Sequence, residues 1–239
     1  GITTDCTEDI MPSLTDLFVA EIERRILTGE WRVGQRVPSF RALADDFNVS
    51  RSVINAGMVE LAEHGYLTTI PRKHTIVADW KKHGTMAILD GMISHNLYNK
   101  EFIDNLLESR MVIECTCAGL AAERRTDRNL DELKAILQEE QKAKSLEEKA
   151  IADVRFHHKI VECSHNLVFS LMLNSYEGII TKLVQTFYEK NPDMEFVNTK
   201  HQILYKALQE KDTDLAVATM QALLEQGEDV IKQIYFKEE

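Results

Sequence analysis

The chain has 239 residues, of which 44% are hydrophobic and 28% are charged, and its formal net charge is −11. This length exceeds one average domain and predicts two, and the hydrophobic content is ample for a core, which argues against a disordered chain. The scarcity of glycine (10) and proline (4) favours helices. No charged-then-apolar leader opens the chain and no apolar run reaches the roughly 18 residues of a membrane span, so the sequence predicts a cytoplasmic protein without membrane contact.

Three short helices are predicted after a mobile tail at residues 1–13. Apolar residues recur at helical spacing across 14–27, and Gly29 is a suitable stop. Ser39 is a natural N-cap for a second helix, and Ser50 is one for a third. The third helix starts with small and basic polar residues, whereas a purely structural helix start would use acidic ones. Its first turn is therefore a candidate contact surface.

Two β-type runs follow these helices, YLTTI at 66–70 and HTIVA at 74–78, joined by the basic tip PRK. Three helices and a hairpin in this order predict a winged helix-turn-helix, in which the start of the recognition helix enters the major groove of DNA. Residues 14–78 hold eight Lys/Arg and eight Asp/Glu, out of 28 and 39 in the chain, so the acidic excess lies elsewhere. The alternative is an ordinary bundle with capped helices and solvated charges.

The stretch ILTGEWRVGQRVPSFRALADDFNVSRSVINAGMVELAEHGYL resembles the DNA-binding domain of the GntR superfamily of bacterial transcription regulators. The matching positions of the family pattern are Gly29, Gly34, Pro38, Leu43, Ala44, Val49, Ser50 and Arg51. The resemblance implies DNA contacts by Arg41, Ser50, Arg51 and Ser52, and a wing tip formed by Arg72 and Lys73. Asn55 lies on the same outer face where the family usually has Arg, and Pro71 and Arg72 replace the usual wing glycine. The operator sequence therefore does not carry over from relatives.

The remainder of the chain resembles the FadR-like branch of that superfamily. VADWKKHGTMAILDGM resembles its linker, here residues 79–99, and FIDNLLESRMVIECTCAGLAAER resembles the start of its helical effector-binding and dimerisation domain, here residues 100–239. Independently, the apolar spacing across 100–236 predicts a helical bundle, so the fold class is mostly α. The charge run QEEQKAKSLEEKA is interpreted as a solvated face with a helix boundary near Ser145.

One set of side chains in the bundle can hold a metal. Asp153 and His157 are four residues apart and share a helix face, and His201 can approach from another helix. Carboxylate and imidazole groups suit zinc, nickel or manganese. The resemblance implies an Asp, a His four residues later and two further His, but the fourth position falls at Leu223. The alternative is a buried Asp153–His157 pair that remains from a lost metal site.

Two classes of effector are compatible with the sequence. The resemblance places Arg110 and Glu114 at effector-binding positions, and IDNLLESR, LMLNSYEGIITKL and YEKNP are similar to acyl-CoA-responsive members. Leu223, Gln226 and Val230 lack the chemistry expected at positions that meet the CoA and its chain. A small organic acid held by Arg110, with or without a metal, is equally compatible.

We therefore predict a dimeric, ligand-responsive DNA-binding regulator, a repressor or an activator, that reads a near-palindromic operator. We predict that the protein is not an enzyme. The alternative from a different class is a metal-dependent hydrolase that uses Asp153, His157 and His201 with an open water position. The sequence shows no nucleophile elbow and no glycine-rich phosphate loop in support of that alternative.

Overall fold

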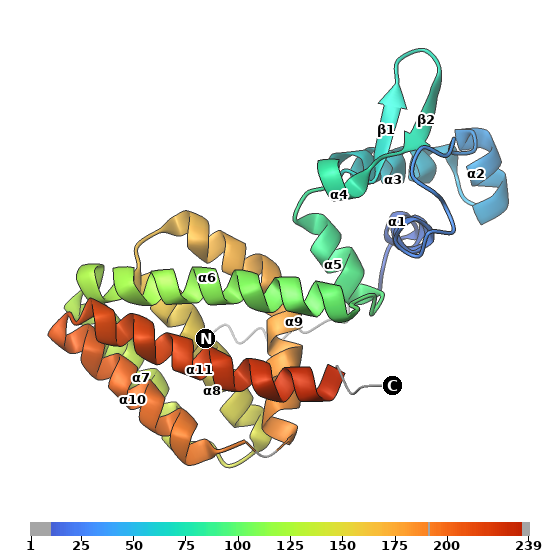
Figure 1. Cartoon of the computed structure of the whole chain (residues 1–239). Helices are drawn as coiled ribbons and strands as arrows, with labels where there is room; N and C mark the ends of the chain where they lie inside the picture. The colour runs from blue at the N-terminus through green and yellow to red at the C-terminus, as the bar shows by residue number, and fades with distance from the viewer. Residues whose placement is uncertain (1–10, 191, 236–239) are drawn as a thin grey trace, which may run out of the picture. The chain divides into compact units, whose positions relative to one another are not determined.

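A computed structural model of the chain describes residues 11–190 and 192–235 (Figure 1). The chain divides after Leu97 into two compact units, which are taken one at a time below. The predicted mobile tail, residues 1–13, lies outside the described residues apart from 11–13, which directly precede the first helix.

The first unit contains the predicted winged helix-turn-helix. Its elements, in chain order, are α1 Leu14–Leu27, α2 Phe40–Phe47, α3 Arg51–Glu63, β1 Leu67–Ile70, β2 His74–Val77, α4 Trp80–His83 and α5 Ala87–Ser94. Both predicted N-caps are confirmed, because the hydroxyls of Ser39 and Ser50 accept hydrogen bonds from backbone N–H groups three residues later. The strands pair antiparallel, with Leu67 opposite Val77. The mostly helical fold class with a winged N-terminal unit is confirmed.

The core of this unit lies among α1, α2, α3 and the hairpin. Phe18, Ile22, Leu43, Ile54 and Leu61 are among its buried side chains. On α1, Leu17 is 53% exposed while Val19 is buried, and on α3 Ile54 is fully buried while Val53 is only partly buried. The position of a residue in the helical period, and not its apolar character alone, therefore decides which side chains face the core.

The segment predicted as a linker, residues 79–99, is largely helical and packs on the winged helix. Ile88 of α5 is buried in the same core as Phe18. Gly65 has a φ of +88°, and a Cβ there would lie 2.5 Å from the Cα of Gly84. The backbone N–H of Thr85 donates to the carbonyl of His64 at 3.0 Å. The end of α3 and the segment that follows the wing are therefore in close backbone contact, which only a residue without Cβ allows.

The second unit is the predicted helical bundle. Its elements are α6 Lys100–Arg124, α7 Asp127–Lys142, α8 Leu146–Cys163, α9 Leu167–Glu189, α10 Met194–Glu210 and α11 Thr213–Tyr235. The long helices α6 and α11 run alongside each other (Figure 1). Small residues of α6, such as Ala118 and Ala122, are fully buried against larger side chains that include Phe156, Leu204 and Met220. The helix boundary expected near Ser145 is confirmed, because Ser145 is the N-cap of α8.

One helix of the described residues, α9, is long and apolar enough by composition to cross a membrane, with a mean hydropathy of 1.2 over 18 residues. A helix in the core of a bundle passes the same test, and α9 buries Leu173, Ile180 and Leu183 on one side. The side chain of Leu171 on the same helix is exposed. The apolar character of α9 is therefore accounted for only in part by packing within the unit.

Candidate functional sites

Four of the predicted DNA-contacting residues lie together on the first unit. Arg41 of α2 and Arg51, Ser52 and Asn55 of α3 line one shallow hollow with Phe40. All four side chains are exposed, so they are available to a ligand. The hydroxyl of the fifth, Ser50, accepts the N–H of Val53 at 3.3 Å and is engaged in capping the helix.

The basic tip of the hairpin is built without the glycine that the family usually has there. Arg72 adopts φ of +62°, a left-handed conformation that an arginine adopts at some cost and a glycine freely. The turn is closed by the N–H of Lys73, which donates to the carbonyl of Ile70 at 3.0 Å. Both basic side chains are exposed at the tip.

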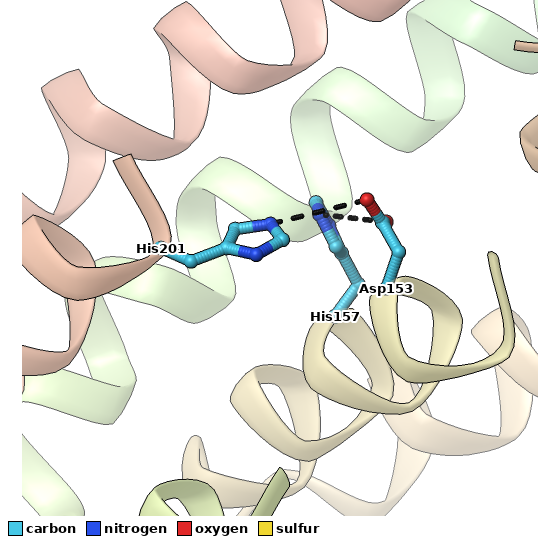
Figure 2. Close-up of side chains that lie close together, drawn as sticks. All are labelled: Asp153, His157 and His201. Carbon is cyan, nitrogen blue, oxygen red and sulfur yellow. Dashed lines mark ion pairs between the residues drawn. The ribbon is translucent and has the colours of Figure 1, made fainter. Parts of the chain in front are cut away.

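The structure brings the three predicted metal ligands together inside the second unit. Asp153 and His157 lie one turn apart on α8, and His201 points toward them from α10 (Figure 2). His157 Nε2 lies 3.5 Å from Asp153 Oδ1, and His201 Nε2 lies 4.0 Å from Asp153 Oδ2. A tetrahedral zinc ion with bonds of about 2.1 Å holds its ligand atoms about 3.4 Å apart. The trio is therefore close to the spacing that such an ion requires.

Two buried glutamates orient the histidine rings. His157 Nδ1 is 2.6 Å from Glu114 Oε1, and His201 Nδ1 is 2.8 Å from Glu140 Oε1. Each carboxylate accepts the Nδ1–H and leaves Nε2 directed at Asp153, which is the arrangement typical of metal-bound histidines. The Nε2 of His201 is shielded from solvent and has no hydrogen-bond partner among the residues that the structure describes. A cation bound by the trio would satisfy this nitrogen.

The Glu114 carboxyl group beside His157 is held in its charged form. Burial acts to raise the pKa of Glu114, but Arg110 and His157 outweigh burial and bring that pKa down to about 2. The Tyr188 hydroxyl donates to Asp153 Oδ2 at 2.7 Å, and burial together with this carboxylate raises the pKa of Tyr188. The phenol therefore remains a donor that fixes the orientation of Asp153.

The charge of the site fits a divalent cation. With neutral imidazoles, the three buried carboxylates and the single guanidinium of Arg110 leave two negative charges, which a divalent ion would balance. Burial acts to lower the pKa of His201, but the hydrogen bond to Glu140 and the charge of Asp153 outweigh it and raise that pKa. The raised pKa means that a proton on His201 competes with a cation at this site.

A cavity of about 50 Å³ opens beside this site. Its wall includes Leu107, Arg110, Asp153, His157, Leu183, Val184, Phe187, Val197, Leu223, Leu224, Gln226, Gly227, Glu228 and Ile231. Arg110, which was predicted to hold an effector, lines the cavity and pairs with Glu114. Glu114, predicted in the same role, is fully buried and stands between Arg110 and His157. Leu223, at the position of the missing fourth ligand, contributes an apolar part of the wall.

Sequence reasoning missed Glu140 and Tyr188. Glu140 belongs to the charge run that was interpreted as a solvated face, yet its side chain is buried against His201. The burial of this side chain could have been predicted from helical periodicity, because Glu140 continues the buried row of Leu133, Ile136 and Leu137. Tyr188 had no such signal, since only the fold brings α9 beside Asp153.

Comparison with known proteins assigns a family to each unit. Residues 14–77 match the family described as "Bacterial regulatory proteins, gntR family", and residues 105–226 match the FCD domain. The second match alone covers about half of the chain.

Similar full-length proteins are transcription regulators. The HTH-type transcriptional regulator LutR of Bacillus subtilis is 27% identical over 221 residues, which cover 89% of this chain and 98% of LutR. The Glc operon transcriptional activator of Escherichia coli is 27% identical over 82% of this chain and 80% of the activator. The Galactonate operon transcriptional repressor of Escherichia coli is 24% identical over 84% of this chain and 90% of the repressor.

Solved structures share the fold. The Listeria monocytogenes structure described as "Lar controls the expression of the Listeria monocytogenes agr system and mediates virulence" has a TM-score of 0.62 at 18% identity, over 96% of this chain and 100% of that one. The structure described as "E. coli McbR/YncC" has a TM-score of 0.51 at 19% identity, over 94% of this chain and 100% of that one.

Proposed function

Because the chain belongs to the GntR family of bacterial regulatory proteins and carries an FCD domain, we propose that it regulates metabolic genes in response to a small organic acid bound beside a divalent metal ion. The family makes it a DNA-binding transcription regulator and not an enzyme, so the hydrolase alternative is set aside. Its relatives include regulators named for the Glc and galactonate operons, which supports a role in metabolism.

The observation that carries the proposal is the convergence of Asp153, His157 and His201, since Asp153 and His157 also line a cavity together with Arg110. The donor set suits zinc, nickel or manganese, and the unpaired Nε2 of His201 and the excess negative charge both favour a cation there. When bound, the ion supplies positive charge and open coordination positions for an anionic ligand. Arg110 provides a second positive group for the same anion.

The size of the cavity favours a small acid over an acyl-CoA. Its volume of about 50 Å³ is several times the 10–15 Å³ that one water molecule needs on the same measure. A ligand of a few heavy atoms fits this space, whereas a fatty acyl chain with its CoA would require the surrounding helices to separate. Gln226 and Leu223 offer no cationic group for the phosphates of a CoA.

The proposed DNA contacts come from the first unit. Arg51, Ser52 and Asn55 belong to the N-terminal turns of α3, the end that enters the major groove in this fold, and Ser50 caps that helix. Arg41 of α2 lines the same hollow. The exposed Arg72 and Lys73 at the wing tip are suited to the phosphate backbone. One such unit covers little DNA, so we propose a homodimer that reads a near-palindromic operator in the cytoplasm.

The proposal is tested by electrophoretic mobility shift with DNA from the promoter beside the gene. We expect a specific shift, and we expect a small carboxylic acid, added with zinc, to change the operator affinity. The same acids without zinc, after treatment with a chelator, should have a smaller effect. If a panel of short carboxylic acids leaves operator binding unchanged while an acyl-CoA alters it, the effector class is wrong. If the protein shifts no DNA from its own locus above the level of random DNA, the assignment of the operator to that locus is wrong.

A further inference from the structure

A second polar group faces the cavity and has no role in the site described above. Gln226 of α11 lines the cavity together with Arg110 and Asp153. Its Oε1 is shielded from solvent and accepts no hydrogen bond from the residues that the structure describes. A buried carbonyl oxygen without a donor is costly, and native proteins rarely leave one unpaired without a reason. The amide oxygen is therefore a position at which a ligand can supply the missing donor.

The surroundings of Gln226 restrict the kind of donor. Leu183, Phe187 and Leu223 give the cavity an apolar wall, on which a second charged group of a ligand would lose its hydration without compensation. Glu228 also lines the cavity, but its carboxylate pairs with Lys232 at 3.7 Å. A neutral acceptor next to apolar carbon surfaces suits a hydroxyl group better than an ammonium group.

We infer that Gln226 selects a short hydroxy acid as the effector, by accepting a hydrogen bond from its hydroxyl group. This inference rests on the proposed function, because it requires the carboxylate of the acid at Arg110 and the metal site. The remaining carbons of the acid then contact Leu223 and its apolar neighbours. A site that hydrogen-bonds a hydroxyl discriminates against the analogue without it, because the partner is then left unpaired in a closed space. We expect a preference of about tenfold or more.

The test uses pairs of acids that differ by one hydroxyl, lactate against propionate and glycolate against acetate, on the zinc-loaded full chain. Affinities are measured by isothermal titration calorimetry for the wild type, for Gln226→Leu and for Gln226→Met, which keeps nearly the same volume if the leucine variant fails to fold. Gln221→Met is the matched control on the same helix, since Gln221 is exposed and its amide bonds Glu225.

We expect the wild type and the Gln221→Met variant to prefer the hydroxy acid of each pair by about tenfold. We expect the Gln226 variants to bind both acids of a pair alike, through a loss confined to the hydroxy acid. A wild type that binds both acids equally overturns the inference while leaving the proposed small-acid effector intact. Binding of neither acid overturns the inference and the effector class together. A preference of the wild type for alanine over lactate also overturns it, because the donor would then be an ammonium group.

Discussion

Replacing Glu140 with glutamine tests whether the buried glutamates prepare the histidines for a metal. In the wild type, the carboxylate of Glu140 accepts the Nδ1–H of His201 at 2.8 Å and leaves Nε2 free for a cation. Glutamine keeps the shape of the side chain and removes its charge. The ring of His201 then loses both the electrostatic support and the fixed tautomer that a carboxylate provides.

The expected loss follows from what such partners contribute elsewhere. Removing the hydrogen-bonded partner of a metal-bound histidine lowers metal affinity by about 10- to 100-fold. At a saturating metal concentration this corresponds to about 1.4–2.7 kcal/mol less stabilisation of the folded state. For a protein of this size, the rise in Tm on adding zinc should shrink by about 3 to 10 °C.

Differential scanning calorimetry of zinc-loaded and zinc-free protein measures this change, because the difference between the two states cancels any direct effect of the substitution on the fold. Glu139→Gln is the control, since its carboxylate lies on the same helix, is half exposed and pairs with Arg155. We expect that control to retain the full zinc effect. An equal zinc effect in Glu140→Gln and Glu139→Gln would refute the role assigned to Glu140.

Four further predictions concern DNA, protons, the metal ligand His157 and the backbone. Arg51→Ala should weaken operator binding by about 1–3 kcal/mol, while Lys73→Ala should weaken operator and random DNA alike, and equal mobility shifts for both variants and wild type would contradict the winged-helix interface. Because Glu140 raises the pKa of His201 against the effect of burial, protons compete with metal increasingly as the pH falls, so the rise in Tm caused by zinc should be large at pH 7.5 and small at pH 5. His157→Ala should abolish that rise and leave operator binding intact; an undiminished rise in the variant would place the metal elsewhere. Gly65→Ala should lower the Tm of the whole chain, because φ is +88° and the new Cβ would lie 2.5 Å from backbone atoms, and an unchanged Tm would mean that this contact yields easily.

The elements of the first unit were predictable because their signals are local. Ser39 and Ser50 cap helices by bonding to N–H groups three residues away, and the hairpin is set by alternation and a short turn. The helical character of the segment after the wing was not predicted, because α4 has only four residues and α5 has a glycine, Gly91, in its middle. Tertiary contacts, such as the burial of Ile88, support these weak helices.

Of the candidate metal site, the sequence predicts most directly the two ligands that lie on one helix. Asp153 and His157 share a helical face, so their spacing alone predicts that they meet. His201 was named as a ligand that can approach from another helix, a choice that the family resemblance supported, and in the structure its ring lies close to Asp153 and His157. The partners Glu114, Glu140 and Tyr188 come from three other helices, and no spacing rule in a single sequence relates residues on helices whose packing is unknown.

The packing of α5 on the winged helix bears on how such regulators can be recombined. A chimaera that joins this DNA-binding domain to a foreign sensor at residue 79 would remove Ile88 from its core and uncover the Gly65 turn. A junction after Leu97 would keep both. The unit to keep whole in a gene fusion is therefore the winged helix together with α4 and α5. Hybrid biosensors built on this chain should have their junctions after Leu97.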